Sequence, residues 1–284
     1  MTIIDGRRIA DEIKKDVKSK LDELKTIYGV TPTIASIIIG DNKESELYLK
    51  LRDKASSEVG IKSKHYRFSK GVSKEEIIKV ISELNNNQDI HGILLQQPIP
   101  EHLSLYNLLS NINPLKDVEG LTPYNLGRLM MGYEKIIPCT PLAVLKILEY
   151  MDVKLEGSNI VIINHSIIVG KPLSILLLNR NATVTVCHVY TKNLKQYTLD
   201  ADILITATGV PGLIKEDYIK KDACVIDVGI TKTSEGIRGD VDFNGVKEKA
   251  SMLTPVPGGV GPATIACSLM NMLETFQNCM ELKK

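Results

Sequence analysis

The chain has 284 residues, of which 43% are hydrophobic and 24% charged, and its formal net charge is +1. This length suits two domains with a sizeable core, and the near-zero charge excludes a broad electrostatic attraction to nucleic acid or membrane. The five cysteines are widely spaced and form no C-x-x-C pair, so neither a zinc site nor a disulfide framework is predicted. We expect a reduced, cytoplasmic protein without a bound metal.

The first half of the chain alternates helical and strand-like patterns. Ser73 begins a capping box with Glu76, and the apolar residues that follow recur at helical spacing. Short apolar runs that end at a glycine or a proline indicate buried strands. The predicted helices are Ile9–Leu24, Ser45–Val59 and the segment that Ser73 begins, and the predicted strands are Thr33–Ile39 and His91–Leu95.

The second half is more regular, with four short apolar runs about 20 residues apart, separated by helical or loop segments. This rhythm predicts a parallel sheet with helices on both faces. A final helix is predicted over Ala263–Phe276, with Pro262 suited to its first turn. The four predicted strands are Asn159–Ile163, Ala182–Cys187, Asp202–Thr206 and Ala223–Val228.

These patterns predict an α/β fold in which two α/β domains flank a cleft. The second domain is predicted to be a Rossmann-like, nucleotide-binding parallel sheet, with ligands at the carboxyl ends of its strands. The predicted hinge is Pro138–Pro141. We place a first domain at residues 1–139, a second at 140–262, and a C-terminal helix, 263–284, that packs back on the first.

Three loops at predicted strand ends carry glycine. Asn164–Pro172 lies between a strand and a helix, an arrangement that holds dinucleotides, although Asn164 stands where a first glycine is usual. The motifs ATGVP and DVGI place Gly209 and Gly229 at two further strand ends, where the backbone can approach a cofactor. Taken singly, each glycine also fits an ordinary strand-to-loop turn.

The segment TPVPGGVGP, residues 254–262, holds three prolines and three glycines directly before the C-terminal helix. Proline fixes φ and glycine permits positive φ, so this composition specifies a rigid backbone with little side-chain bulk. Such a loop lets main-chain N–H groups approach a planar or anionic ligand. The alternative is a tight turn before a helix.

Together these motifs resemble those of the methylenetetrahydrofolate dehydrogenase/cyclohydrolase family, and the resemblance covers essentially the whole chain. It implies oxidation of 5,10-methylenetetrahydrofolate to the methenyl form by hydride transfer to a nicotinamide, then hydrolysis to 10-formyltetrahydrofolate. It also implies a homodimer, with tetrahydrofolate derivatives and a nicotinamide dinucleotide as ligands. The near-zero net charge predicts no nucleic-acid or membrane partner. The segments that carry it are IIIGDNKESELYLK, GILLQQPIP, NPLKDVEGLTPYN, PCTP, the S-x-x-V-G-K-P loop, ATG, DVGI, GDVDF and TPVPGGVGP.

The resemblance assigns roles to matching positions. Tyr48 matches the family's active-site tyrosine, which lies over the folate, and Gln96 matches the glutamine that partners the catalytic lysine. Ser166 matches a loop residue that meets the cofactor, and Ile230 matches a backbone contact near the nicotinamide. The folate-side loop is matched by Pro257, Gly258, Gly259 and Val260.

Two positions on the folate side depart from the family pattern. Arg52 stands four residues after Tyr48, where the family has its catalytic lysine, and arginine stays protonated, so it cannot act as a base. Glu119 replaces the second aspartate of D-V-D-G but still offers a carboxylate to the pterin, beside the matching Asp117. We expect Tyr48, Arg52, Gln96 and Glu119 to form the catalytic group, with the cyclohydrolase step reduced or lost. The alternative for the two carboxylates is solvation at a turn.

Two positions on the cofactor side also depart. Some family members hold the 2′-phosphate of NADP with an arginine at the His165 position, or with a serine or arginine at the Val189 position, where valine offers nothing to a phosphate. We expect NADP as cofactor, with NAD possible and the preference weak. The predicted cofactor-binding residues are Asn164, His165, Ser166, Gly170, Val189, Gly209, Gly229 and Ile230.

Two other functions stay open at this point. The Rossmann-like half alone also fits a nicotinamide-dependent dehydrogenase of another small substrate. The changes at Arg52 and Glu119 also fit a non-catalytic protein that binds folate or a nucleotide. Turnover of methylenetetrahydrofolate distinguishes these functions.

Overall fold

The structure is a computed structural model of the chain and describes residues 1–234 and 236–282. The chain divides into two compact units, and each is assembled from two separate segments. The six-stranded unit comprises Met1–Ala10 and Thr140–Thr264. The three-stranded unit comprises Asp11–Cys139 and the segment from Ile265 onward.

The N-terminal residues correct the predicted boundary of the first domain. The prediction placed residues 1–139 together, but β1 (Thr2–Ile3) pairs in parallel with β11 (Met252–Leu253) in the six-stranded sheet. A two-residue strand has no periodicity to read, and its partner lies far along the chain. The predicted C-terminal helix is α10 (Val260–Glu281), and positions 283–284 of that prediction lie outside the described residues.

The six-stranded unit confirms the predicted parallel sheet. Its strand order is β1-β11-β8-β7-β5-β6, and every pairing is parallel. Strand β5 lies between β6 and β7, so the chain leaves it to one side and returns to the other, which makes its carboxyl end a topological switch point. The four central strands are β5 (Asn159–Ile163), β6 (Thr183–Cys187), β7 (Ile203–Thr206) and β8 (Cys224–Asp227).

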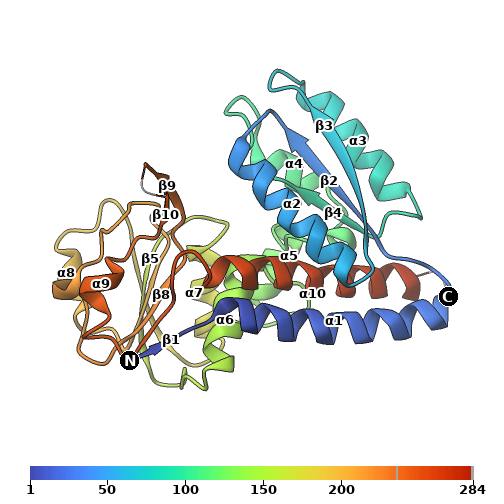
Figure 1. Cartoon of the computed structure of the whole chain (residues 1–284). Coiled ribbons are helices and arrows are strands. Elements are labelled where there is room, and N and C mark those ends of the chain that lie inside the picture. The colour runs from blue at the N-terminus through green and yellow to red at the C-terminus, as the bar shows by residue number, and fades with distance from the viewer. Residues whose placement is uncertain (235, 283–284) are drawn as a thin grey trace. The chain divides into compact units, whose positions relative to one another are not determined.

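Short helices and a hairpin complete this unit (Figure 1). Side chains such as Val161, Leu204 and Val225 are buried between the sheet and its covering segments, which explains why these strands read as continuous apolar runs. The remaining elements are α6 (Cys139–Tyr150), α7 (Gly170–Leu178), α8 (Leu194–Thr198), η2 (Glu216–Tyr218), α9 (Phe243–Val246) and the antiparallel pair β9 (Thr231–Thr233) and β10 (Gly236–Arg238).

The three-stranded unit holds a parallel sheet in the order β3-β2-β4, built from β3 (Lys62–Phe68), β2 (Thr33–Ile39) and β4 (Gly92–Leu95). The predicted capping box forms, because Ser73 accepts a hydrogen bond from the Glu76 N–H at the start of α3. The other helices begin and end as follows: α2 (Lys43–Glu58), α3 (Lys74–Asn86), α4 (Leu105–Asn111), η1 (Pro114–Lys116) and α5 (Pro123–Met130).

Helices α1 (Gly6–Tyr28) and α10 contribute residues to both units and run side by side (Figure 1). Within the three-stranded unit, Val17 and Leu21 of α1 share one buried cluster with Leu269 and Phe276 of α10. Burying such side chains stabilises a fold by about 1.5–3 kcal/mol each, so the end of the chain is part of this core. Among the described residues, no helix combines the length and apolarity needed to cross a membrane.

Candidate functional site

Helix α2 is held against the end of strand β4 by its first turn. Asn42 Oδ1 accepts a hydrogen bond from the Ser45 N–H at 2.9 Å, which caps the helix. Ser45 Oγ donates to the carbonyl of Gln97 at 3.0 Å, which ties the helix to the segment after β4. Tyr48 and Arg52 follow on the same face, four residues apart, and are therefore brought to Gln96 at the carboxyl end of β4.

Arg52 is the centre of this group and is only 3% exposed. Its guanidinium donates to Gln96 Oε1 at 3.1 Å and to Glu119 Oε1 at 3.4 Å, and its Cζ lies 4.9 Å from the centroid of the Tyr48 ring. The structure thus brings together all four residues predicted as catalytic. The Nε of Arg52 has no hydrogen-bond partner within the described part of the chain, so one buried donor is unsatisfied.

The electrostatics of this group follow from burial. Burial raises the pKa of the Glu119 carboxyl above its ordinary value, Arg52 opposes that change, and Asp117 adds to it. Burial likewise raises the pKa of the Tyr48 hydroxyl, which keeps the phenol protonated. The Cys139 thiol lies in the same environment and donates to the carbonyl of Val118 at 3.3 Å. Arg52 therefore supplies the positive charge of the site.

Asp117, predicted to bind the substrate, is held by hydrogen bonds from its own surroundings. Its carboxylate is 1% exposed and accepts hydrogen bonds from Gly120 N at 2.9 Å, Thr122 N at 2.8 Å and Asn125 Nδ2 at 3.0 Å. Those donors lie in its own loop and at the start of α5. The side chain is thus engaged in shaping the loop that carries Glu119.

In the six-stranded unit, the loop between β5 and α7 is closed by the side chain of Asn164. Its Oδ1 accepts from Ser166 N and Ser166 Oγ, both at 2.8 Å, and from Gly170 N at 2.9 Å, while its Nδ2 donates to the carbonyl of Ala207 at 2.7 Å. A Cβ on Gly170 would lie 1.9 Å from the Asn164 carbonyl oxygen, so only glycine fits there. Asn164 Oδ1 therefore accepts hydrogen bonds from main-chain N–H groups of the kind that bind a phosphate in a glycine-rich loop.

The ends of β7 and β8 present the remaining predicted backbone contacts. Gly209 has φ +71° and is exposed, and Thr231 Oγ1 donates to its carbonyl at 3.0 Å. Ile230 is 58% exposed. Gly229 is buried instead, and a Cβ there would lie 2.1 Å from Asp240 Oδ1. The close approach at Gly229 is to a carboxylate of the protein, whereas Gly209 and Ile230 face outward.

Two histidines lie at the ends of β5 and β6. The rings of His165 and His188 have centroids 4.8 Å apart, and both residues are exposed. His188 Nδ1 accepts from the Tyr190 N–H at 3.2 Å. The sequence had assigned no chemistry to His188. Val189 is 82% exposed and has no group that binds phosphate.

The proline- and glycine-rich loop, residues 254–262, belongs to the six-stranded unit and leads into α10. The Val256–Pro257 bond is cis, and Gly258 has φ +113°. A Cβ on Gly259 would lie 2.6 Å from the carbonyl oxygen of Pro255, so the turn is closed on itself. Val260 is buried as the first residue of α10.

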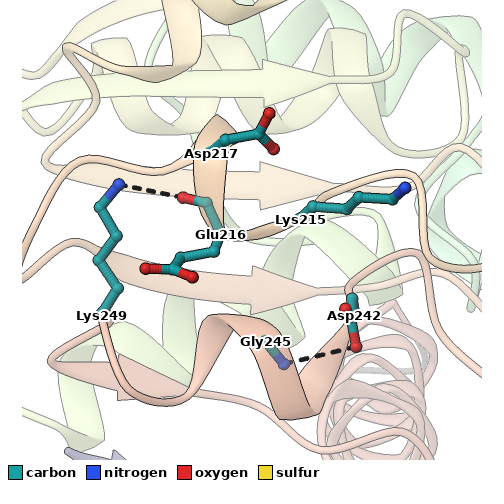
Figure 2. Close-up of a pocket in the computed structure, with 6 residues that line it drawn as sticks. All are labelled: Lys215, Glu216, Asp217, Asp242, Gly245 and Lys249. Atoms are coloured by element: carbon teal, nitrogen blue, oxygen red, sulfur yellow. Dashed lines mark hydrogen bonds between the residues drawn. The ribbon is translucent and has the colours of Figure 1, made fainter.

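A separate surface hollow of about 540 Å³ lies between η2 and α9 (Figure 2). Lys249 Nζ donates to the carbonyl of Glu216 at 3.1 Å across it, and Gly245 N donates to Asp242 at 3.4 Å. None of the predicted site residues lines it. The lining residues are Lys215, Glu216, Asp217, Asp242, Gly245 and Lys249.

Two buried aspartates were not assigned a role from the sequence. Asp227 ends β8, and Asp240 lies in the GDVDF segment; they are 3% and 0% exposed. Burial raises the pKa of Asp227 to about 6. The available signal was an aspartate with a glycine one or two residues away, a pattern that an exposed turn also produces.

The fold and its loops define a class. A doubly wound parallel sheet with a glycine-containing loop at its switch point is a dinucleotide-binding domain, and here it is joined to a unit with a buried Arg–Gln–Glu group. Two family models match the chain: the catalytic domain of tetrahydrofolate dehydrogenase/cyclohydrolase over residues 4–119, and its NAD(P)-binding domain over residues 138–280. The chain therefore belongs to the tetrahydrofolate dehydrogenase/cyclohydrolase family.

Relatives match over nearly the full length. The chain is 48% identical over 271 residues to the bifunctional protein FolD of Methanosarcina mazei, covering 95% of this chain and 94% of that protein. The crystal structure of the FolD methylenetetrahydrofolate dehydrogenase/cyclohydrolase of Campylobacter jejuni is 44% identical, with a TM-score of 0.95 over 98% of this chain and 99% of that one. The Trypanosoma brucei enzyme complexed with NADP and an inhibitor is 34% identical, with a TM-score of 0.94 over 100% and 99%.

Proposed function

We propose that this protein oxidises 5,10-methylenetetrahydrofolate to the methenyl form, with NADP⁺ or NAD⁺ as the hydride acceptor. The observation that carries the proposal is the group around Arg52, in which Tyr48, Gln96 and Glu119 converge at the end of β4. Full-length membership of the family, with matches to both of its domains, supports the same reaction.

On the folate side, the residues of this chain bind and orient. Hydride loss from the methylene carbon needs no protein acid or base once the carbon is correctly placed, so positioning is the main contribution. The Tyr48 ring offers an apolar face, and Gln96 and Glu119 offer oxygens to the polar edge of a pterin. We propose that Pro257, Gly258, Gly259 and Val260 also contact folate, as the family resemblance implies.

On the cofactor side, the residues fit a dinucleotide. Gly209 leaves open space where a side chain would stand, since the nearest atom to a Cβ there is Thr231 Oγ1 at 4.0 Å. A bound nicotinamide dinucleotide supplies the hydride acceptor. We propose that Ser166, Gly209 and Ile230 contact it, and that Asn164 and Gly170 hold the loop in shape.

We further propose that the preference for NADP over NAD is weak. His165 and His188 lie at the ends of β5 and β6, and neither offers the guanidinium fork that holds a phosphate with two hydrogen bonds. Val189 offers no donor to a 2′-phosphate. The kcat/KM ratio for the two cofactors tests this, and a preference above about 100-fold for NADP would contradict it.

The hydrolysis step is proposed to be slow. Arg52 cannot accept a proton, and its guanidinium is already engaged by Gln96 and Glu119. Arg52 and Glu119 also depend on each other, because shortening either side chain leaves the other without its counter-charge. Arg52→Lys alone is therefore expected to restore little. The double change Arg52→Lys with Glu119→Asp restores both residues of the family pattern, and we expect it to hydrolyse faster than Arg52→Lys alone.

Purified protein tests both steps by absorbance. We expect reduced cofactor to accumulate with methylenetetrahydrofolate, and methenyltetrahydrofolate to be hydrolysed at least tenfold more slowly than it forms. Equal rates would overturn the proposal for hydrolysis. Turnover with other substrates alone would instead identify a different dehydrogenase, and binding without turnover would identify a non-catalytic protein.

We also propose a homodimer that works in the cytoplasm. Strand β6 is an edge of the six-stranded sheet, and Val186 on it is 36% exposed, which leaves a sheet edge for a second copy. All five cysteines are thiols, as in a reducing compartment. Light scattering that gave the 31.4 kDa mass of one chain at assay concentration would contradict the dimer.

A further inference from the structure

The buried side chain of Asp240 lies against two loops of the six-stranded unit, the loop after β7 and the loop after β8. It is fully buried, and its Oδ2 accepts hydrogen bonds from Thr206 Oγ1 at 2.8 Å and from Thr208 N at 2.5 Å. Thr206 ends β7, and Thr208 lies in the loop that follows. One carboxylate oxygen thus fixes the course of the backbone as it leaves the sheet.

The other oxygen of Asp240 lies against the loop after β8. A Cβ on Gly229 would lie 2.1 Å from Asp240 Oδ1, and this oxygen has no hydrogen-bond partner in the described part of the chain. The arrangement is reciprocal, since a Cβ on Gly239 would lie 2.1 Å from Asp227 Oδ2. The two carboxylates therefore pack directly on glycine backbone, where any side chain would collide.

Asp227 binds the same segments with main-chain donors. Its Oδ1 accepts from Gly229 N at 2.9 Å and Asp240 N at 3.1 Å, and its Oδ2 accepts from Val241 N at 2.8 Å. No ion pair forms at either aspartate among the described residues. The loops after β7 and β8 are thus held by one network whose two carboxylates are buried.

The same two loops also carry residues that are exposed to solvent. Gly209 and Ile230 are exposed, and Thr231 Oγ1 links the two loops there by donating to the Gly209 carbonyl. A change in the buried network therefore moves backbone that a ligand meets, although the network itself is out of reach of that ligand. Fixing such loops in advance lowers the entropy cost of binding.

We propose that Asp240 is a positioning residue for the dinucleotide, acting through Thr208 and Gly229 to set the spacing of the loops that receive it. This inference rests on the proposed function only in taking the dinucleotide to bind at the carboxyl ends of β7 and β8. Asp240 touches neither the cofactor nor the reacting atoms.

The test compares Asp240→Ala with Asp240→Asn by isothermal titration calorimetry with NADP⁺ and NAD⁺. Alanine removes the acceptor for Thr206 and Thr208, and we expect the Kd for both cofactors to rise at least tenfold. Asparagine keeps one oxygen that can accept both bonds, so we expect a Kd within threefold of the wild type. In turnover, KM for the cofactor is expected to rise in the alanine variant, with a smaller fall in kcat.

Asp242→Ala is the matched control. Asp242 is two residues away, is exposed, and accepts from Gly245 N at the start of α9 (Figure 2). We expect this variant to bind both cofactors like the wild type. A merely structural role for Asp240 predicts instead that a folate analogue loses affinity together with the cofactor, or that asparagine fails to rescue; either result overturns the proposal.

A second pair of variants covers the case in which Asp240→Ala does not fold. Gly229→Ala places a methyl against Asp240 Oδ1 and is expected to weaken cofactor binding at least tenfold. Thr206→Val removes one donor and is expected to weaken it two- to fivefold. Wild-type affinity in both would overturn the proposal. Failure of the wild-type protein to bind either cofactor would instead remove the proposed function itself.

Discussion

Two groups of buried carboxylates in this protein are stabilised in opposite ways. Glu119 faces the Arg52 guanidinium at 3.4 Å, within a group of long side chains at the end of β4. Asp227 and Asp240 form no ion pair among the described residues and are surrounded by main-chain N–H groups and a hydroxyl. Each arrangement offsets part of the cost of burying a charge.

The difference shows what each group can do. A guanidinium facing a carboxylate leaves charge and hydrogen-bonding groups near a substrate, so that region suits chemistry. A carboxylate surrounded by backbone donors organises loops, and its short side chain transmits any change directly to the main chain. Substitutions in the two groups are expected to differ in their effects on stability and on its pH dependence.

Glu119→Ala is expected to lower the free energy of unfolding by about 3 kcal/mol, because it leaves Arg52 buried without a counter-charge. The dehydrogenase rate should fall with it. Urea titration followed by circular dichroism measures the change. The matched control is Glu46→Ala in the same unit, whose partner Arg67 is exposed; solvent screens that pair, and the expected change is below about 1 kcal/mol. Equal effects of the two changes would refute the contrast between buried and exposed pairs.

Asp227→Asn is expected to change how stability depends on pH. Burial raises the pKa of Asp227 to about 6, whereas the pKa of an aspartate in the unfolded chain is about 3.9. Between these values the folded state binds the extra proton, so the stability from this group is complete below pH 4 and is lost as the pH rises through 6. Relative to the variant, the wild type should lose about 2–3 kcal/mol from pH 4 to pH 7.

Calorimetry at several pH values measures this difference, and parallel profiles for the two proteins would contradict it. Asp217→Asn gives a control of opposite sign. The hydrogen bond from Lys195 lowers the pKa of Asp217, so its contribution is present at neutral pH and is lost as the pH falls.

Lys116→Met tests a third arrangement, in which a buried cation is satisfied by backbone carbonyls. Lys116 Nζ donates to the carbonyls of Leu84, Asn85 and Asn87 at 3.0, 2.8 and 2.8 Å, at the carboxyl end of α3. Methionine keeps the apolar stem but frees these carbonyls, so we expect a loss of about 2 kcal/mol. Hydrogen exchange should accelerate at the end of α3. The exposed Lys50→Met is the control, and equal exchange in both variants would count against this role.

The sequence predicted the central strands well, for a physical reason. Strands β2 and β5 are buried on both faces, so each is a continuous apolar run, and both were predicted with the bounds the structure shows. Strand β3 was missed because it is an edge strand with the sequence KSKHYRF, in which no residue is fully buried. Its pairing depends on backbone hydrogen bonds, which leave little trace in composition.

The candidate site was only partly predictable. The spacing of Tyr48 and Arg52 on one helix is local, so their shared face could be anticipated from the chain. The engagement of Asp117 by its own loop could not be read from residue types, since a carboxylate looks the same whether it binds a ligand or three N–H donors. The role proposed for Asp240 depends on its packing against Gly229, which only the three-dimensional structure shows.

The pairing of Thr2 with Met252 has a consequence for how the protein is made. Strand β1 cannot pair until Met252 and Leu253, far along the chain, have been synthesised. The three-stranded unit also waits, because Leu269 and Phe276 complete its core. Neither half is therefore an independent fragment, and cutting the gene at residue 140 would separate each unit from a part that it needs.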